Sequence, residues 1–249
     1  MQEIFSYKGL ERFFSLLKEK ADTLLFSEWD GEAAFLIRHD VDFDLGLAYR
    51  LAKLENQCDV RSTFFVLTSC PTYNILSQTN REILQDMVNM GFEIGLHFDP
   101  MVYGDLTDEQ FEEKAREEAK MLGIACGQII KSIALHNPSI HGRKPRFKTF
   151  IDAYDPRYFS DECYISDSFR RFRGKDPFTF IDRVEDGPVQ INLHPLHYSP
   201  DGDGYAKVMN DSLRKYIDDL NTVFSANPNF KEDTAPHLWE KMVALDQPL

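Results

Sequence analysis

The sequence predicts an α/β fold built around a parallel β-sheet. Segments with the apolar spacing of a helix alternate with short apolar runs typical of buried strands along most of the 249 residues. A chain of this length with 43% hydrophobic residues can bury one large core. In folds of parallel β-α-β units, ligand sites gather at the carboxyl ends of the strands. The ends of the expected strands are therefore where a site is sought.

The expected strands are rich in apolar, branched and aromatic residues. They cover residues 33–38, 62–67, 92–96, 129–135, 162–166 and 188–193. Helical spacing covers residues 8–21, 44–57, 79–91, 107–122 and 205–225. Capping-box spacing at residues 79–82 and 107–110 is expected to open two of these helices. Residues 137–160 lack clean periodicity and predict a long irregular connection, of the kind that is often functional. The last twenty or so residues predict an irregular tail.

Five expected strands are followed by an ionisable side chain. These residues are Asp40, His97, His136, Asp167 and His194. Ionisable groups are costly to bury without partners, so one shared polar site explains all five together. Asp42 joins Asp40 on one face of an extended chain, because side chains at i and i+2 point the same way. His39 is expected to point to the opposite face.

These residue types are those of a hydrolytic metal site. A catalytic zinc site uses three ligands from His, Asp or Glu and keeps one position open. The ion polarises a carbonyl and acidifies water, while a carboxylate takes a proton and a histidine gives one to the leaving group. The pattern therefore predicts a divalent metal cofactor, Zn²⁺, and hydrolytic chemistry.

The motifs resemble those of the polysaccharide deacetylase superfamily, which shares the NodB homology domain and is classed as carbohydrate esterase family four. Asp-Val-Asp at residues 40–42 is similar to its first motif, residues 91–97 to its second, and Leu-His at 193–194 to its last. The resemblance covers about residues 33–198. It implies a distorted (β/α)7-type barrel in a single domain of residues 1–249, with the N-terminal helix and the C-terminal helix and tail packed on it.

The resemblance also implies roles for individual residues. Asp40 matches the general base, Asp42 and His97 match metal ligands, and His194 matches the catalytic acid. Family members usually carry a second metal-binding histidine four residues after the first, where this chain has Met101. A thioether is a poor ligand for such an ion, so the third ligand has to come from elsewhere.

The predicted replacement ligand is His136, with Asp99 in reserve. His136 begins a His-Asn-Pro-Ser segment. Together with Ser-Asp-Ser at residues 166–168 and His-Pro at 194–195, this segment resembles a deacetylase-like subgroup associated with surface-polysaccharide and sugar-modification pathways.

Further residues beside the motifs are predicted to contact the substrate. They are Asp99, Asn137, Arg143, Asp167 and His197. Asp167 either orients a catalytic group or caps the next turn. Arg143 lies in the irregular connection, where a solvated loop is an equally good interpretation. His197 is expected to shape the wall of the pocket.

The leading hypothesis is a metal-dependent hydrolase that removes an acetyl or formyl group from an amino sugar by breaking its amide bond. The expected partner is an amino sugar or oligosaccharide from surface-polysaccharide or sugar-precursor synthesis. The alternative is a catalytically impaired deacetylase-fold protein that binds a carbohydrate or a protein partner. An HD-type phosphohydrolase is disfavoured, because its His-Asp doublet belongs on helices of an all-α fold.

Charge and cysteine content restrict the other partners. The chain has 28 Lys and Arg against 41 Asp and Glu, a formal charge of −13, which argues against nucleic-acid binding. No apolar run approaches the roughly 20 residues of a membrane span. The N-terminal residues do not resemble a signal peptide. The four cysteines form no Cys-x-x-Cys pair and suit a reducing compartment, so a cytoplasmic location is predicted.

Overall fold

The computed structural model describes residues 2–142, 144–229 and 243–244. The chain divides into two compact units, Met1–Gly202 and Asp203–Leu249. Every predicted site residue belongs to the first unit, and the second contains helix α7 (Tyr205–Phe224). The packing of this helix and the tail on the rest of the chain stays a prediction, and most of the tail lies outside the described residues. No described helix is both long and apolar enough to cross a membrane.

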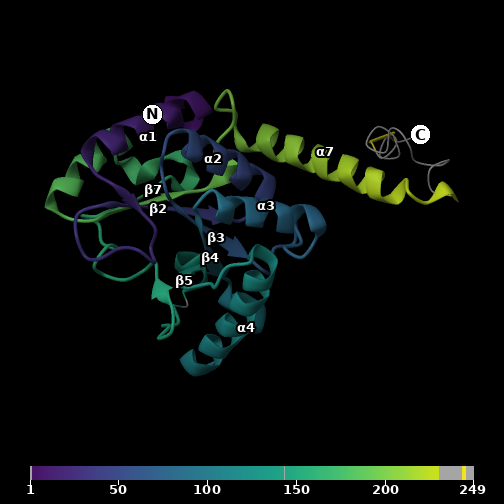
Figure 1. Ribbon diagram of the computed structural model, residues 1–249, viewed down its shortest axis with the longest axis horizontal. Helices are drawn as coiled ribbons and strands as arrows, with labels where there is room; N and C mark the ends of the chain where they lie inside the picture. Colours follow the sequence, from purple (N-terminus) through teal and green to yellow (C-terminus); the bar gives the residue numbers. More distant parts are fainter. Residues whose placement is uncertain (1, 143, 230–242, 245–249) are drawn as a thin grey trace. The chain divides into compact units, whose positions relative to one another are not determined.

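A parallel sheet forms the centre of unit Met1–Gly202 (Figure 1). Its strands are β2 (Phe35–Val41), β3 (Thr63–Leu67), β4 (Glu93–Phe98), β5 (Ser132–Leu135), β6 (Ile151–Asp152), β7 (Tyr164–Ser166) and β8 (Val189–Leu193). They are ordered β6-β5-β4-β3-β2-β8-β7, and the short β1 (Thr23–Leu24) pairs with the start of β2. Every pairing is parallel. The predicted seven-stranded distorted barrel is confirmed.

The sheet curls so that strand β8 faces the segment after β6 across a packed interior. Gln190 of β8 donates hydrogen bonds to the carbonyls of Ala153 and Tyr158, which follow β6, at 3.0 and 3.1 Å. The interior is tightly filled at Gly95 of β4, where an added Cβ would lie 2.6 Å from the ring of Phe65. Only glycine therefore fits at this position without displacing its neighbours.

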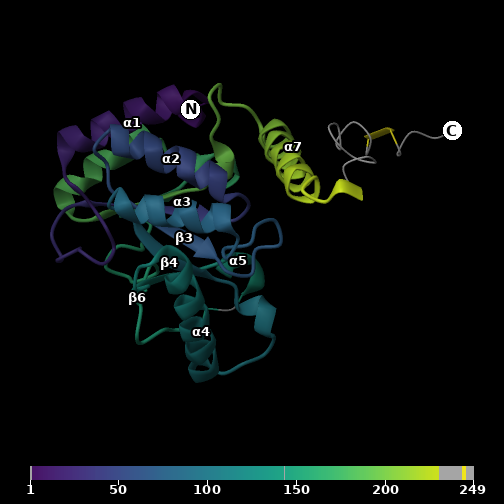
Figure 2. The ribbon, with the colours of Figure 1, turned by 45° about the vertical axis from the view of Figure 1, so that its right-hand side comes forward.

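The outer face of the sheet is covered by helices. They are α1 (Tyr7–Lys20), α2 (Leu45–Gln57), α3 (Gln78–Asn89) and α4 (Asp108–Cys126), and consecutive members pack side by side (Figure 2). Side chains of β2 alternate between the two faces, as expected for a strand. Phe35 and Ile37 pack outward in the helix-covered core, whereas Leu36 packs inside the barrel.

Most element predictions agree with the structure, with local differences. The capping box of α4 is confirmed at Thr107, whereas the one predicted at residues 79–82 is wrong. Helix α3 begins earlier, with Ser77 as its N-cap. Asn74 sets this start, because it forms a turn in which its carbonyl and side-chain oxygens accept hydrogen bonds from the first residues of the helix and from those just before it. The connection predicted to be irregular contains the short helix α5 (Pro138–His141) and strand β6. Strand β6 has only two residues, which is too short to produce a periodic pattern in the sequence.

Candidate active site

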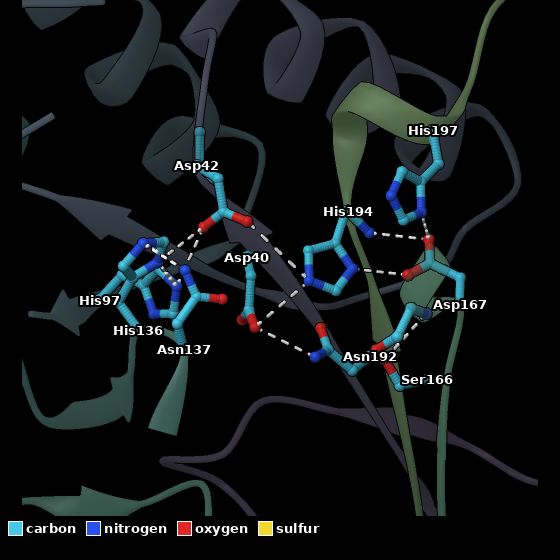
Figure 3. Close-up of polar contacts among 12 residues, drawn as sticks. Asp40, Asp42, His97, His136, Asn137, Ser166, Asp167, Asn192, His194 and His197 are labelled. Atoms are coloured by element: carbon cyan, nitrogen blue, oxygen red, sulfur yellow. Dashed lines mark hydrogen bonds and ion pairs between the residues drawn. The ribbon is translucent and has the colours of Figure 1, made fainter. Parts of the chain in front are cut away.

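Six of the predicted residues lie together at the carboxyl end of the parallel sheet (Figure 3). Asp40 lies in β2 and Asp42 just after it, and His97 lies in β4. His136, Asp167 and His194 directly follow β5, β7 and β8. His39 points the other way, as predicted: its Nε2 lies 2.6 Å from Glu55 Oε1 of helix α2 and its ring stacks on Phe64.

Asp42, His97 and His136 present three ligand atoms to one point. Asp42 Oδ1 lies 3.1 Å from His97 Nε2 and 3.3 Å from His136 Nδ1, and the two nitrogens are 3.3 Å apart. Ligands about 2.0–2.1 Å from a tetrahedral Zn²⁺ lie about 3.3–3.4 Å from one another. The triangle therefore fits such an ion, with one position left for substrate or water. Asp42 is also partly open to solvent, its side chain being 31% exposed.

The outer nitrogen of each imidazole is also held. His97 Nδ1 lies 3.1 Å from the carbonyl oxygen of Ala134, a contact that puts the proton on Nδ1 and leaves Nε2 free to bind an ion. The Asn137 amide nitrogen lies 2.8 Å from His136 Nε2; for Nδ1 to bind an ion, the amide has to turn its oxygen toward a protonated Nε2 instead. Burial alone would raise the pKa of Asp42, but the close contacts with His136 and His97 hold that pKa far below its usual range. The site thus keeps a carboxylate anion for a cation to bind.

Asp40 is buried next to Asp42, and only one of its two carboxylate oxygens accepts hydrogen bonds. Its Oδ2 accepts hydrogen bonds from Arg38 Nη2 at 2.9 Å and from Asn192 Nδ2 at 3.0 Å. Its Oδ1 is buried and makes no hydrogen bond with any described residue. Burial opposes ionisation, but the charge of Arg38 outweighs it and lowers the pKa of Asp40. Asp40 is therefore an anion with one oxygen free to accept a proton.

His194 lies between the two aspartates and a third carboxylate. Its Nε2 is 3.8 Å from Asp40 Oδ2 and 3.9 Å from Asp42 Oδ2. Its Nδ1 is 2.5 Å from Oδ1 of the fully buried Asp167. Burial lowers the pKa of His194, but the charge of Asp167 and this hydrogen bond outweigh it and raise the pKa to about 9. A protonated Nε2 therefore faces the same space as Asp40.

The structure places the remaining predicted residues differently. Asp99 accepts a hydrogen bond from the backbone N–H of Met101 and caps a 3₁₀ turn, and Met101 is 52% exposed. Asp167 contacts His194 Nδ1 and makes no side-chain cap on the turn that follows it, so the interpretation that it orients His194 stays a prediction. His197, expected in the pocket wall, is instead only 5% exposed and lies against Asp167, because the chain folds back after β8. Arg143 lies outside the described residues.

Sequence reasoning missed Arg38 and Asn192, which hold Asp40. Arg38 is 1% exposed and also donates to Tyr154 Oη at 3.2 Å and Gln190 Oε1 at 3.3 Å. The signal was present, since a charged residue in an otherwise apolar strand requires a buried partner. That partner, two residues on, is Asp40.

Comparison with known proteins gives structural likenesses alone. No family model and no curated protein matches the chain. Similar solved structures include a CE4 family pseudoenzyme from Bacillus anthracis, at 14% identity and TM-score 0.41, covering 74% of this chain and 62% of that one. Peptidoglycan deacetylase PdaC from Bacillus subtilis matches at 15% identity and TM-score 0.43, covering 73% and 83%. The chitin deacetylase of the fungal pathogen Colletotrichum lindemuthianum matches at 14% and 0.44, covering 75% and 83%.

At these identities and TM-scores the likenesses concern the fold and assign no family, activity or substrate to this chain. The chain spans less than two thirds of the length of the Bacillus anthracis protein. At identities of 14–15%, substrate and activity have to be inferred from the site itself.

Proposed function

We propose that this protein is a metal-dependent hydrolase that removes an acetyl or formyl group from an amino sugar. The proposal is supported by the arrangement of three groups at the carboxyl end of the sheet. A triangle of ligand atoms, an ionised carboxylate with a free oxygen and a protonated imidazole all face one space. Hydrolysis of an amide needs these three functions together.

Asp42, His97 and His136 would hold the ion. When bound, a divalent ion such as Zn²⁺ supplies an electrophile that polarises the acyl carbonyl and favours deprotonation of water. Two imidazoles and a carboxylate make a donor set typical of catalytic zinc. His136 takes the place that Met101 does not fill, because the neighbouring strand β5 ends beside His97.

Asp40 acts as general base. Arg38 and Asn192 fix its Oδ2, so Oδ1 is the atom that takes the proton of the attacking water. His194 acts as general acid. Asp167 holds the Nδ1 proton, so Nε2 carries the proton that passes to the departing nitrogen of the sugar. The amine cannot leave as an anion, so this transfer completes the cleavage.

The test compares Asp40→Asn with the matched control Asp59→Asn. Zinc-loaded protein is incubated with N-acetylated and N-formylated amino sugars and chitin oligomers, and released acetate or formate is measured. Loss of a general base lowers the rate by about 10²–10⁴-fold. Asp59 is 91% exposed and has a left-handed backbone that Asn tolerates, so its variant keeps the wild-type rate. Undiminished acid release by Asp40→Asn refutes the assignment.

A binding module without catalysis is the second candidate, favoured by the exposed Met101 at the usual ligand position. Metal analysis separates the two. Stoichiometric zinc that is lost in His97→Ala supports the enzyme, whereas no zinc under any loading condition supports the module. The predicted cytoplasmic location favours nucleotide-linked, lipid-linked or soluble amino sugars over a finished cell-wall polymer.

A further inference from the structure

His197 lies beside Asp167, at the carboxylate oxygen that the ring of the proposed acid His194 does not contact, and has no role in the function proposed above. It ends the 3₁₀ turn Pro195–His197 that follows β8, and its N–H donates to the His194 carbonyl at 2.8 Å. Its Nδ1 lies 2.9 Å from Asp167 Oδ2. The ring is buried; its centroid lies 5.0 Å from that of the His194 ring and 6.4 Å from that of Phe5, which it meets edge-on.

Asp167 therefore faces two imidazoles on opposite oxygens (Figure 3). Oδ1 is engaged by His194 Nδ1 at 2.5 Å. Oδ2 accepts a hydrogen bond from the His194 backbone N–H at 2.9 Å, and His197 Nδ1 lies within ion-pair distance of it, also at 2.9 Å. Burial disfavours the charge of Asp167, but the neighbouring charges of His197 and His194 and their hydrogen bonds hold its pKa well below the usual range.

The two contacts on Oδ2 differ in what they control. The backbone N–H belongs to the residue that Asp167 orients, so it moves with the end of β8. His197 lies at the far end of the 3₁₀ turn that begins at His194, and its ring packs edge-on against Phe5. Its ring nitrogen thus meets the carboxylate from a side chain other than His194, as does the buried hydroxyl of Tyr198, which also interacts with Asp167. Functional imidazoles depend on such outer partners for their ring orientation.

We propose that His197 is a positioning residue that clamps the Asp167 carboxylate and thereby aims the His194 ring at the space beside Asp40. The role depends on the proposed function, in which His194 protonates the leaving group. It assigns a task to the second His of the His-Pro-Leu-His segment at residues 194–197.

The test uses His197→Asn and His197→Leu, which match in size and differ in one hydrogen-bond donor. The Asn amide nitrogen takes the place of Nδ1, and Leu has no donor. We expect His197→Leu to lower kcat on an N-acetylated chitin oligomer by about 10–100-fold, the effect typical of an outer partner, with KM nearly unchanged. His197→Asn is expected to recover most of this loss.

A second substrate separates positioning of the acid from general damage. The phenolate of 4-nitrophenyl acetate leaves without protonation, so its hydrolysis is expected to stay within about 3-fold of wild type in both variants. Equal losses on amide and ester in His197→Leu would overturn the proposal, as would no loss on the amide. In an Asp167→Asn background the His197→Leu change is expected to add little, because its effect passes through Asp167.

A spectroscopic readout stands independently of activity. In metal-free protein, the low-field NMR resonance of the His194 Nδ1 proton is expected to persist in His197→Asn and to broaden or vanish in His197→Leu. If this resonance is unchanged in His197→Leu, the proposal fails. If wild-type protein hydrolyses neither the chitin oligomer nor 4-nitrophenyl acetate, the proposed function fails. If the His194 resonance still responds as expected, the inference that His197 holds Asp167 stands without it. If His197→Leu does not fold, His197→Gln replaces it in each of these measurements. Its donor lies one bond farther out, so the results expected are those given for His197→Leu.

Discussion

Replacing Arg38 with Met tests whether the buried ion pair under the site is as tightly coupled as the structure indicates. Arg38 is 1% exposed, and Asp40, its partner at 2.9 Å, is 5% exposed. Met fills most of the space of the aliphatic stem but removes the charge and three hydrogen bonds. The change therefore leaves a buried carboxylate with Asn192 as its remaining hydrogen-bond donor among the described residues.

The size of the effect follows from the burial of the pair. Removing one member of a buried ion pair costs about 3–5 kcal/mol, because the remaining charge loses its compensation. An exposed pair is worth about 1 kcal/mol or less. Arg61 and Glu28 form such a pair, with contacts at 2.6 and 3.1 Å and both side chains more than 40% exposed. Arg61→Met is thus a matched control for the loss of a guanidinium.

The assay is urea unfolding of metal-free protein at pH 7, which excludes stabilisation by bound ion. Arg38→Met is expected to lower the free energy of unfolding about 3 kcal/mol more than Arg61→Met does. Adding Asp40→Asn to Arg38→Met is expected to recover part of the loss, because no charge is then left buried. Equal costs for the two Arg variants, or a double variant that is less stable than Arg38→Met, would refute this account of Asp40.

Three further outcomes follow from the structure. His136→Ala is expected to weaken zinc binding by more than the roughly 10–100-fold typical of an outer partner, whereas Met101→Leu leaves it unchanged; calorimetric titration of both decides whether His136 is a ligand. Because the pKa of Asp167 is depressed on folding, its contribution to stability is present above its unfolded pKa of about 3.9 and is lost as pH falls below it. The stability gap between wild type and Asp167→Asn should therefore shrink in urea unfolding from pH 5 to pH 3, and a constant gap would contradict the shift. Gly95→Ala is expected to cost about 1–3 kcal/mol in the same assay, because its Cβ would overlap the Phe65 ring.

The site was predictable from sequence wherever a polar residue ends an apolar run. Asp40, His97 and His194 follow this rule, because parallel strands share one carboxyl edge. Arg38 was not predictable in the same way, since it lies inside the run and its partner depends on which face each side chain takes. His197 was misplaced for a related reason: nothing in the sequence shows that the turn after β8 folds back beneath Asp167.

The boundaries of elements were predictable where a local interaction sets them. Thr107 and Gln110 cap each other, so the start of α4 could be predicted from four residues. The start of α3 could not, because Asn74, outside the helix, fixes it through a turn. Strand β6 is defined only by its pairing with β5, a contact between distant segments that no local pattern encodes.

The curvature of the sheet explains how three proposed metal ligands from different strands come together. Asp42 follows β2 and His97 lies in β4, so β3 separates them, and in a flat sheet their strands would be about 10 Å apart. The curled sheet and the length of the side chains close this gap to 3.1 Å. The same curvature carries the end of β5 inward, where the N–H of His136 continues the ladder by donating to the carbonyl of Phe98 at 2.8 Å. His136, which follows β5, thus lies at the point where Asp42 and His97 meet.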